Sequence, residues 1–381
     1  MTLPMMKNAP RQVGTLRLFY FMAGMGVSTW AIIVPFTKIR FALDDATLGY
    51  ILLAPGIGGI LAMPVVGLLI KRFGSRTVLL ASSIIFGTVL PLLTIAPGKL
   101  AFTALLFVFG ITFGGIDIGV NAQAVVIEGR SGRRLMSSFH ALFSFGALAV
   151  ALATSLLLKL GLSNLLCSVC CAAGIFAILL QGGILVPKSQ DLLSDGPALA
   201  LPNRATLALG LCCFACFLTE GAVTDWSTIL LRFSRGASAV TAPFGYAGFA
   251  VMMALARLGG DALAMRFGAV RLMQAGCLLA GAGMLLVVAS SSMIAGICGF
   301  ALVGLGTGNI APLVFSAAAR IPGVAPTASA PAVISLGYAG FLLGPVVIGF
   351  VANQLNLSFA MGLVAILLIA ISFVAPAVEP D

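Results

Sequence analysis

The sequence predicts an all-α membrane protein with twelve transmembrane helices, arranged as two parallel repeats of six. Three observations predict it: twelve long apolar runs fill almost the whole chain, few residues are charged, and the two halves partly repeat one another. Hydrophobic residues make up 60% of the chain and charged residues 8%, whereas soluble domains carry about 25% charged residues. Glycine is frequent, at 45 residues, which suits helices that pack closely in lipid.

Each apolar run is long enough to cross a bilayer, because a helix rises about 1.5 Å per residue and the hydrocarbon core is about 30 Å thick. The run 102–126 carries one charge, Asp117, and the run 357–376 carries none. We expect spans at 14–38, 44–70, 76–96, 99–127, 137–160, 163–186, 204–231, 239–265, 270–290, 292–320, 326–353 and 356–376.

The basic residues orient these spans. With the N-terminus inside, fifteen of the 21 basic residues fall in or beside cytoplasmic segments, so the positive-inside rule puts both termini in the cytoplasm. They lie in short loops next to the spans, so we expect membrane lipid headgroups, and no nucleic acid, as their partners. The first thirteen residues lack the pattern of a removable signal peptide.

All eight cysteines lie in apolar spans. Cys167 and Cys170, like Cys213 and Cys216, have the spacing of metal ligands, but polar residues that could support a metal are missing nearby. We therefore read the cysteines as small apolar side chains and expect no metal and no cofactor.

One polar stretch, 187–203, interrupts the interior of the chain. It predicts a cytoplasmic central loop between an N-terminal six-helix bundle, 1–186, and a C-terminal six-helix bundle, 204–381. The bundles correspond at an offset of about 194 to 196. The matching segments are Arg72-Phe73-Gly74 with Arg266-Phe267-Gly268, Gly110 and Gly114 with Gly304 and Gly308, and Thr29-Trp30 with Asp225-Trp226.

Residues 67–76 read Gly-Leu-Leu-Ile-Lys-Arg-Phe-Gly-Ser-Arg and resemble the loop between helices two and three of the major facilitator superfamily. That family has two six-helix parallel repeats, and it usually has an aspartate where this chain has Lys71. Segments 117–123, 137–144 and 220–227 resemble its sugar-permease-like bacterial branch, which includes many uncharacterised inner-membrane members. The resemblance implies a transporter of the bacterial inner membrane that works by alternating access.

Charges inside the spans are the candidate site residues, because a charge in a bilayer is costly unless it is neutralised or faces water. Asp117 lies near mid-membrane on a stripe with Asn121 and close to Gln123, where it could bind a proton or a solute hydroxyl. The alternative is a neutral carboxyl held by hydrogen bonds between helices. In the permeases that this chain resembles, an acid on the fourth helix serves in coupling or sugar binding, and Asp117 matches it.

A second polar stripe carries Glu220 in the middle of span seven, with Thr224 and Ser227 on the same face. Asp225 lies about 140° round the helix from Glu220, toward other neighbours, and is a further candidate for binding solute in the cavity. We expect Asp117 and Glu220 to couple transport to protons. His140, the only histidine, is a third proton-coupling candidate, with Ser144 one turn further; the alternative for His140 is helix packing.

Trp30 and Trp226 hold equivalent positions in the two halves. Tryptophan either anchors a helix at the membrane interface or stacks on the apolar face of a solute, and both interpretations stay open. Asn309 and Tyr338 are further candidates for lining a solute cavity, with helix packing as the alternative.

Arg257 and Asp261 are four residues apart, so they share a helix face and could form either a structural ion pair or a moving cytoplasmic gate. The candidate gating residues are Arg72, Arg76, Arg257, Asp261 and Arg266.

The sequence contains no nucleotide-binding loop or nucleophile elbow, so we expect no enzyme. The predicted function is secondary active transport of a small polar, sugar-like solute by proton symport in a monomeric protein. A proton-antiport exporter of a drug or metabolite is the alternative.

Overall fold

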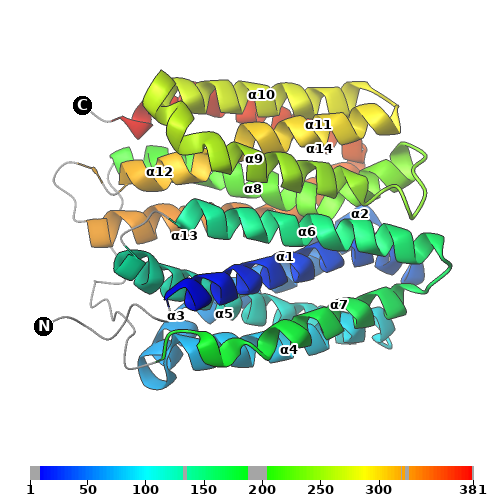
Figure 1. Ribbon diagram of the computed structural model, residues 1–381. Helices are drawn as coiled ribbons and strands as arrows, with labels where there is room; N and C mark the ends of the chain where they lie inside the picture. The colour runs from blue at the N-terminus through cyan, green and yellow to red at the C-terminus, as the bar shows by residue number, and fades with distance from the viewer. Residues whose placement is uncertain (1–8, 132–134, 188–203, 319, 322–325, 380–381) are drawn as a thin grey trace, which may run out of the picture. The chain divides into compact units, whose positions relative to one another are not determined.

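Helices form the computed structural model of this chain, and the residues that it describes contain no strand. These residues are 9–131, 135–187, 204–318, 320–321 and 326–379. The predicted central loop, 187–203, lies outside them except for its first residue. Figure 1 shows the helices in order along the chain.

The chain divides into two compact units. The first contains Met1–Ile33 and Ala54–Ser194, and the second contains Val34–Leu53 and Asp195–Asp381. The boundary between residues 194 and 195 falls inside the predicted central loop. The segment 34–53, which the sequence analysis assigns to the N-terminal bundle, groups with the second unit.

The first unit consists of most of α1 and of five further long helices. In this unit α4 packs against both α5 and α7, and α6 contacts α5 and α7. The bounds are α1 Ala9–Arg40, α3 Leu53–Phe73, α4 Ser75–Ile95, α5 Lys99–Ser131, α6 Met136–Lys159, α7 Asn164–Leu179 and the short 3-10 helix η1 Gly182–Ile184.

The second unit contains the short helix α2 and the helices of the second half. Here α13 packs against α8 and α2, and α10 packs against α11 and α14. The bounds are α2 Asp45–Ile51, α8 Arg204–Ser234, α9 Phe244–Phe267, α10 Ala269–Ala289, α11 Met293–Thr307, α12 Ile310–Ala318, α13 Pro326–Gln354, α14 Leu357–Ser372 and η3 Ala375–Val378.

Ten helical segments in the described part of the chain are long and apolar enough to cross a membrane, and two further apolar helices, Phe244–Gly260 and Leu357–Ser372, are shorter. Large apolar side chains such as Leu100 and Leu180 are more than 80% exposed. A soluble protein would bury such side chains, whereas lipid accommodates them. The prediction of an all-helical, multi-pass membrane protein is confirmed.

Corresponding positions in the two halves of the chain share local geometry. Gly74 and Gly268, which are 194 positions apart, have φ angles of 89° and 86°, a conformation that glycine adopts without a Cβ clash. Each is the residue from which the next helix, α4 or α10, begins. Just before them, the guanidinium of Arg72 lies 5.2 Å from the Phe73 ring centre, and that of Arg266 lies 5.3 Å from the Phe267 ring centre.

A second pair of equivalent positions brings two backbones together. A Cβ on Gly110 of α5 would lie 2.0 Å from the Pro55 carbonyl oxygen, and one on Gly304 of α11 would lie 2.1 Å from the Phe249 carbonyl oxygen. The members of the two contacts are each 194 positions apart. Only glycine allows helices to approach this closely, so corresponding positions in the two halves make similar close helix contacts.

Buried cysteines contribute to the apolar core of the second unit. Cys212, Cys213, Cys216 and Cys277 are fully buried there, together with aliphatic side chains such as Val314. Cys170 and Cys298 are exposed. These positions agree with the interpretation of the cysteines as small apolar side chains.

Candidate functional site

An ion pair lies in the middle of the second unit. Nη2 of Arg257, on α9, is 3.3 Å from Oε1 of Glu220, on α8, and both side chains are about 15% exposed. Glu220 is sixteen residues from the start of α8 and fourteen from its end, so it lies at the centre of a membrane-spanning helix. A buried charge of either sign is costly alone, and each partner neutralises the other.

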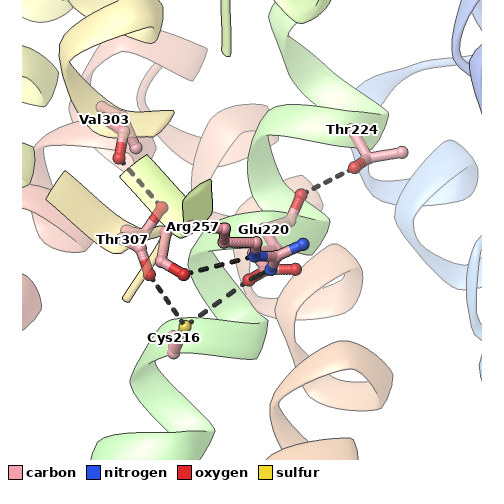
Figure 2. A network of polar contacts seen from close by, with 7 residues as sticks. Cys216, Glu220, Thr224, Arg257, Val303 and Thr307 are labelled. Atoms are coloured by element: carbon pink, nitrogen blue, oxygen red, sulfur yellow. Dashed lines mark hydrogen bonds and ion pairs between the residues drawn. The ribbon is translucent and has the colours of Figure 1, made fainter. Parts of the chain in front are cut away.

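Backbone carbonyls at a helix end complete this network, which Figure 2 shows from close by. Nε of Arg257 donates to the carbonyl of Gly308 at 3.2 Å, and Sγ of Cys216 lies 3.6 Å from Glu220 Oε1 and 4.0 Å from the Thr307 carbonyl oxygen. Gly308 and Asn309 form the turn between α11 and α12. The last carbonyls of a helix lack donors within the helix, so the turn offers acceptors at this depth.

The ion pair leaves polar atoms open. Oε2 of Glu220 and Nη1 of Arg257 have no hydrogen-bond partner in the described part of the chain. Neither atom is among the enclosed side-chain atoms that lack a partner. Since a guanidinium has five N–H donors, Arg257 keeps donors available for a further ligand.

Further polar side chains line the same region of α8 and α9. The Thr224 hydroxyl donates to the Glu220 carbonyl at 2.7 Å. Tyr246, buried on α9, lies near Thr224 and near the charges of Glu220, Asp225 and Arg257. The predicted polar stripe on α8 therefore faces polar groups of α9.

A second polar network lies within the first unit. The Tyr20 hydroxyl, on α1, donates to Oδ1 of Asn121 at 2.9 Å, and Nδ2 of Asn121 lies 3.2 Å from Oδ1 of Asp117. The amide of Asn121 thus links α1 to Asp117 on α5. The sequence analysis placed Asp117 and Asn121 on one stripe, and the structure brings them into contact.

The Tyr20 ring connects this network to His140. It stacks on Phe139 with the ring centres 5.4 Å apart, and it meets the His140 ring edge-on at 5.2 Å. Asp117 and Glu128 both lie close enough to act on Tyr20 electrostatically. Three of the residues that could carry a proton, Asp117, His140 and Tyr20, are therefore neighbours in one unit.

Gln123 is fully buried and makes all of its contacts within the protein. Its amide donates to the Val186 carbonyl at 3.0 Å and to the Ser75 hydroxyl, and its carbonyl accepts from the Val186 N–H at 2.8 Å. These bonds join α5 to the start of α4 and to the end of the first unit. They favour a structural role, and the prediction that Gln123 binds solute stays untested.

Both tryptophans are buried, which argues against anchoring at the lipid interface. The ring of Trp30 packs about 6 Å from those of Phe102 and Phe109 in the first unit. Trp226 is fully enclosed, and its Nε1 has no acceptor among the described residues. Ser144, on α6, is buried as well.

Asn309 lies beside the ion pair. Its Nδ2 donates to the Ala256 carbonyl at 3.0 Å, next to Arg257, so it holds the α11–α12 turn against α9. Tyr338 packs edge-on against Phe217, with ring centres 5.6 Å apart. The structure thus places Asn309 in the network around Glu220 and places Tyr338 in an aromatic cluster.

The candidate gating residues that the structure describes make different contacts. The guanidinium of Arg72 lies over the ring of Phe73, and that of Arg266 lies over the ring of Phe267. Nη1 of Arg76 lies 3.4 Å from the Gly183 carbonyl oxygen. The side chain of Asp261 lies outside the described residues, so its pairing with Arg257 stays a prediction. The described contacts of Arg257 go to Glu220 and Gly308.

Comparisons with known proteins place this fold. The family model described as the Major Facilitator Superfamily matches residues 16–339. The chain belongs to the Major Facilitator Superfamily. An uncharacterised transporter of this superfamily from Yersinia pestis is 39% identical over 97% of this chain and 96% of its own length. The membrane protein MosC of Rhizobium meliloti is 31% identical over 90% of this chain and 84% of its own.

Solved structures of the superfamily share the fold at low sequence identity. The nucleoside transporter NupG matches with a TM-score of 0.77 and 12% identity, over 97% of this chain and all of its own. The fucose:proton symporter FucP of E. coli matches with a TM-score of 0.65 and 18% identity, over 98% of this chain and all of its own. The superfamily membership makes this protein a membrane transporter, as the sequence analysis predicted.

Sequence reasoning missed four features of the two polar networks in this superfamily member. Tyr20 and Tyr246 lie in apolar runs and read as packing residues, and the contact of Arg257 with Glu220 crosses from one helix to another. A signal for the fourth feature, the turn at Gly308, was present: the segment 304–309 holds three glycines and ends in asparagine.

Proposed function

We propose that this protein is a proton-coupled symporter of a small polar solute that works by alternating access. In the described part of the chain ten apolar segments are long enough to span and two are shorter; we assign all twelve as spans, in two six-helix repeats in the bacterial inner membrane, with both termini in the cytoplasm. The matching geometry at Gly74 and Gly268 and at Gly110 and Gly304 supports this assignment.

One observation carries the proposal: Glu220 and Arg257 form an ion pair at the middle of a membrane-spanning helix, and Oε2 and Nη1 have no hydrogen-bond partner among the described residues. A protein that only packed its helices would have no need of such a pair, because apolar residues of similar volume are at least as stabilising. Charged groups inside spans mark ion and substrate pathways in membrane proteins.

The two carboxyl networks supply the coupling. In our proposal Asp117, tied to Tyr20 through Asn121, and Glu220, paired with Arg257, carry the coupled protons during the cycle. Two of the structural neighbours are a nucleoside transporter and a fucose:proton symporter. Their solutes are small and polar, which is the class that these networks suit.

The test is proton flux that depends on solute. Purified protein in liposomes loaded with a pH indicator is exposed to single sugars, sugar acids and nucleosides under an inward proton gradient. Symport predicts that the active solute accelerates proton entry, and that Asp117→Asn or Glu220→Gln abolishes the acceleration. Exit of solute against entering protons would indicate antiport and overturn symport.

Matched controls separate coupling from general damage. Asp44→Asn makes the same chemical change at an exposed helix cap, where asparagine caps as well as aspartate. Glu379→Gln makes it at an exposed carboxyl that accepts from the Ala269 N–H. Both controls should keep full flux. If Asp117→Asn and Glu220→Gln keep it too, the coupling assignment is wrong.

A further inference from the structure

We propose that Arg257 binds a single carboxylate of the transported solute. Glu220 pairs with the Arg257 guanidinium until Glu220 is protonated, and the guanidinium then becomes available to the solute. The inference rests on the proposed function and gives the solute a class: a small polar molecule that bears one carboxylate. It follows from the contacts of the ion pair, from its charge and from its surroundings.

The described contacts of Arg257 engage only some of its hydrogen-bond donors. Glu220 approaches it through one oxygen, at 3.3 Å, and Nε is committed to the Gly308 carbonyl. Nη1 has no partner in the described part of the chain. Once Glu220 withdraws, Nη1 and Nη2 form the two-pronged edge that a carboxylate accepts from in parallel. The bond to Gly308 keeps the guanidinium in place meanwhile.

The charge of the site links the carboxylate to a proton. With Glu220 ionised, the pair is neutral. If a solute carboxylate joined it, the site would carry one net negative charge, and if Glu220 were protonated alone, it would carry one net positive charge. Each is costly inside a membrane. Protonation of Glu220 together with binding of one carboxylate keeps the pair neutral. Binding of the proton and the carboxylate together is therefore favoured over binding of either one alone.

This linkage favours symport. A proton raises the affinity for the carboxylate, and by thermodynamic reciprocity the carboxylate raises the affinity for the proton by the same factor. The single cation also selects a monoanion, because a phosphate dianion on Arg257 would leave a net negative charge. A neutral sugar would leave the guanidinium unpaired whenever Glu220 takes a proton.

Among the described residues around the ion pair, no second cation could bind the carboxylate in place of Arg257. The groups near the pair are Cys213, Cys216 and Thr224 of α8, Tyr246 of α9 and the carbonyls of Thr307 and Gly308. Asp225 of α8 acts on Tyr246. Ser227, on the same helix face as Glu220, is fully buried, and its hydroxyl has no partner among the described residues.

The test uses small probes of the proposed chemistry. Formate, lactate and gluconate are compared with the uncharged 1,2-propanediol and sorbitol, by thermal unfolding of the purified full-length protein. Glu220→Gln should be stabilised by the carboxylates at every pH. The wild type should respond only where Glu220 is protonated, and its apparent affinity should fall about tenfold per pH unit above that range. In unbuffered solution the wild type should take up one proton per carboxylate.

Two variants distinguish this site from general anion binding. Arg257→Gln should lose the response to carboxylates. Arg232→Gln removes a cation that lies over Phe36 and Phe233 and should keep the response. If Glu220→Gln folds too poorly to measure, the proton uptake of the wild type gives the same answer.

Three results would overturn the inference: uncharged probes that stabilise as well as carboxylates, an Arg257→Gln variant that responds like the wild type, or a complete lack of response to formate. Proton-driven transport that depends on Glu220, found together with one of these, would leave the proposed function standing. Carboxylate binding through Arg257 without proton-driven transport would overturn the proposed function and leave the binding site.

Discussion

Pro312 lies four residues after Gly308, and it leaves the Gly308 carbonyl without a hydrogen-bond donor from the same helix. In a continuous helix the carbonyl of Gly308 would accept from the N–H of residue 312, and proline has none. The helix ends at Thr307 and restarts at Ile310, and Nε of Arg257 donates to the carbonyl that the proline leaves open. One residue of α12 thus orients the cation of α9.

We expect Pro312→Ala to weaken this arrangement. The new N–H competes with Arg257 for the Gly308 carbonyl, and a hydrogen bond from a charged group contributes about 1.5–3 kcal/mol, so solute-driven proton flux should fall by about tenfold or more. Pro91→Ala, inside α4 of the first unit, is the matched control and should keep its flux. Unchanged flux in Pro312→Ala would show that the carbonyl does not orient Arg257.

Removal of either member of the ion pair should have unequal effects on stability. Glu220→Gln leaves a guanidinium, which keeps its charge, so unfolding free energy should fall by about 3–5 kcal/mol. Arg257→Gln leaves a carboxyl that can become neutral by binding a proton, so its loss should be smaller. Chemical unfolding of both variants in detergent measures the difference, and equal losses would contradict the account.

The hydrogen bond of Tyr20 should matter for coupling more than for folding. Tyr20→Phe keeps the stacking on Phe139 but removes the donor to Asn121, which should cost about 1 kcal/mol of stability and release the Asn121 amide from its fixed orientation toward Asp117. Thermal unfolding and solute-driven proton flux measure the two effects. Tyr50→Phe removes an exposed hydroxyl and should change neither.

The paired glycines of the repeat should respond alike to a methyl group. Gly110→Ala and Gly304→Ala place a Cβ about 2 Å from the carbonyls of Pro55 and Phe249, so both should destabilise by about 1–3 kcal/mol. Gly362→Ala, in α14, meets nothing within 4 Å and should be neutral or slightly stabilising, because alanine favours helix. A stable Gly304→Ala variant would contradict the close backbone contact.

The sequence predicted the fold class well because lipid imposes a strong rule: apolar runs of spanning length are helices. It also found Asp117 and Glu220, since a carboxyl in such a run stands out. It did not pair Glu220 with Arg257, because their contact depends on how α8 and α9 face each other, while spacing along one helix suggested Asp261 as the partner. Tyr20 stayed hidden because a tyrosine in an apolar run gives no sign of its hydroxyl's partner.

The division of the chain has a mechanical consequence. The boundary between Ile33 and Val34 cuts through the continuous helix α1, two residues before Pro35, and the boundary after Leu53 adjoins the break between α2 and α3. Proline removes one backbone hydrogen bond of a helix and allows the helix to bend. We therefore expect that Pro35 in α1 and the break between α2 and α3 are the points at which the chain would bend during alternating access.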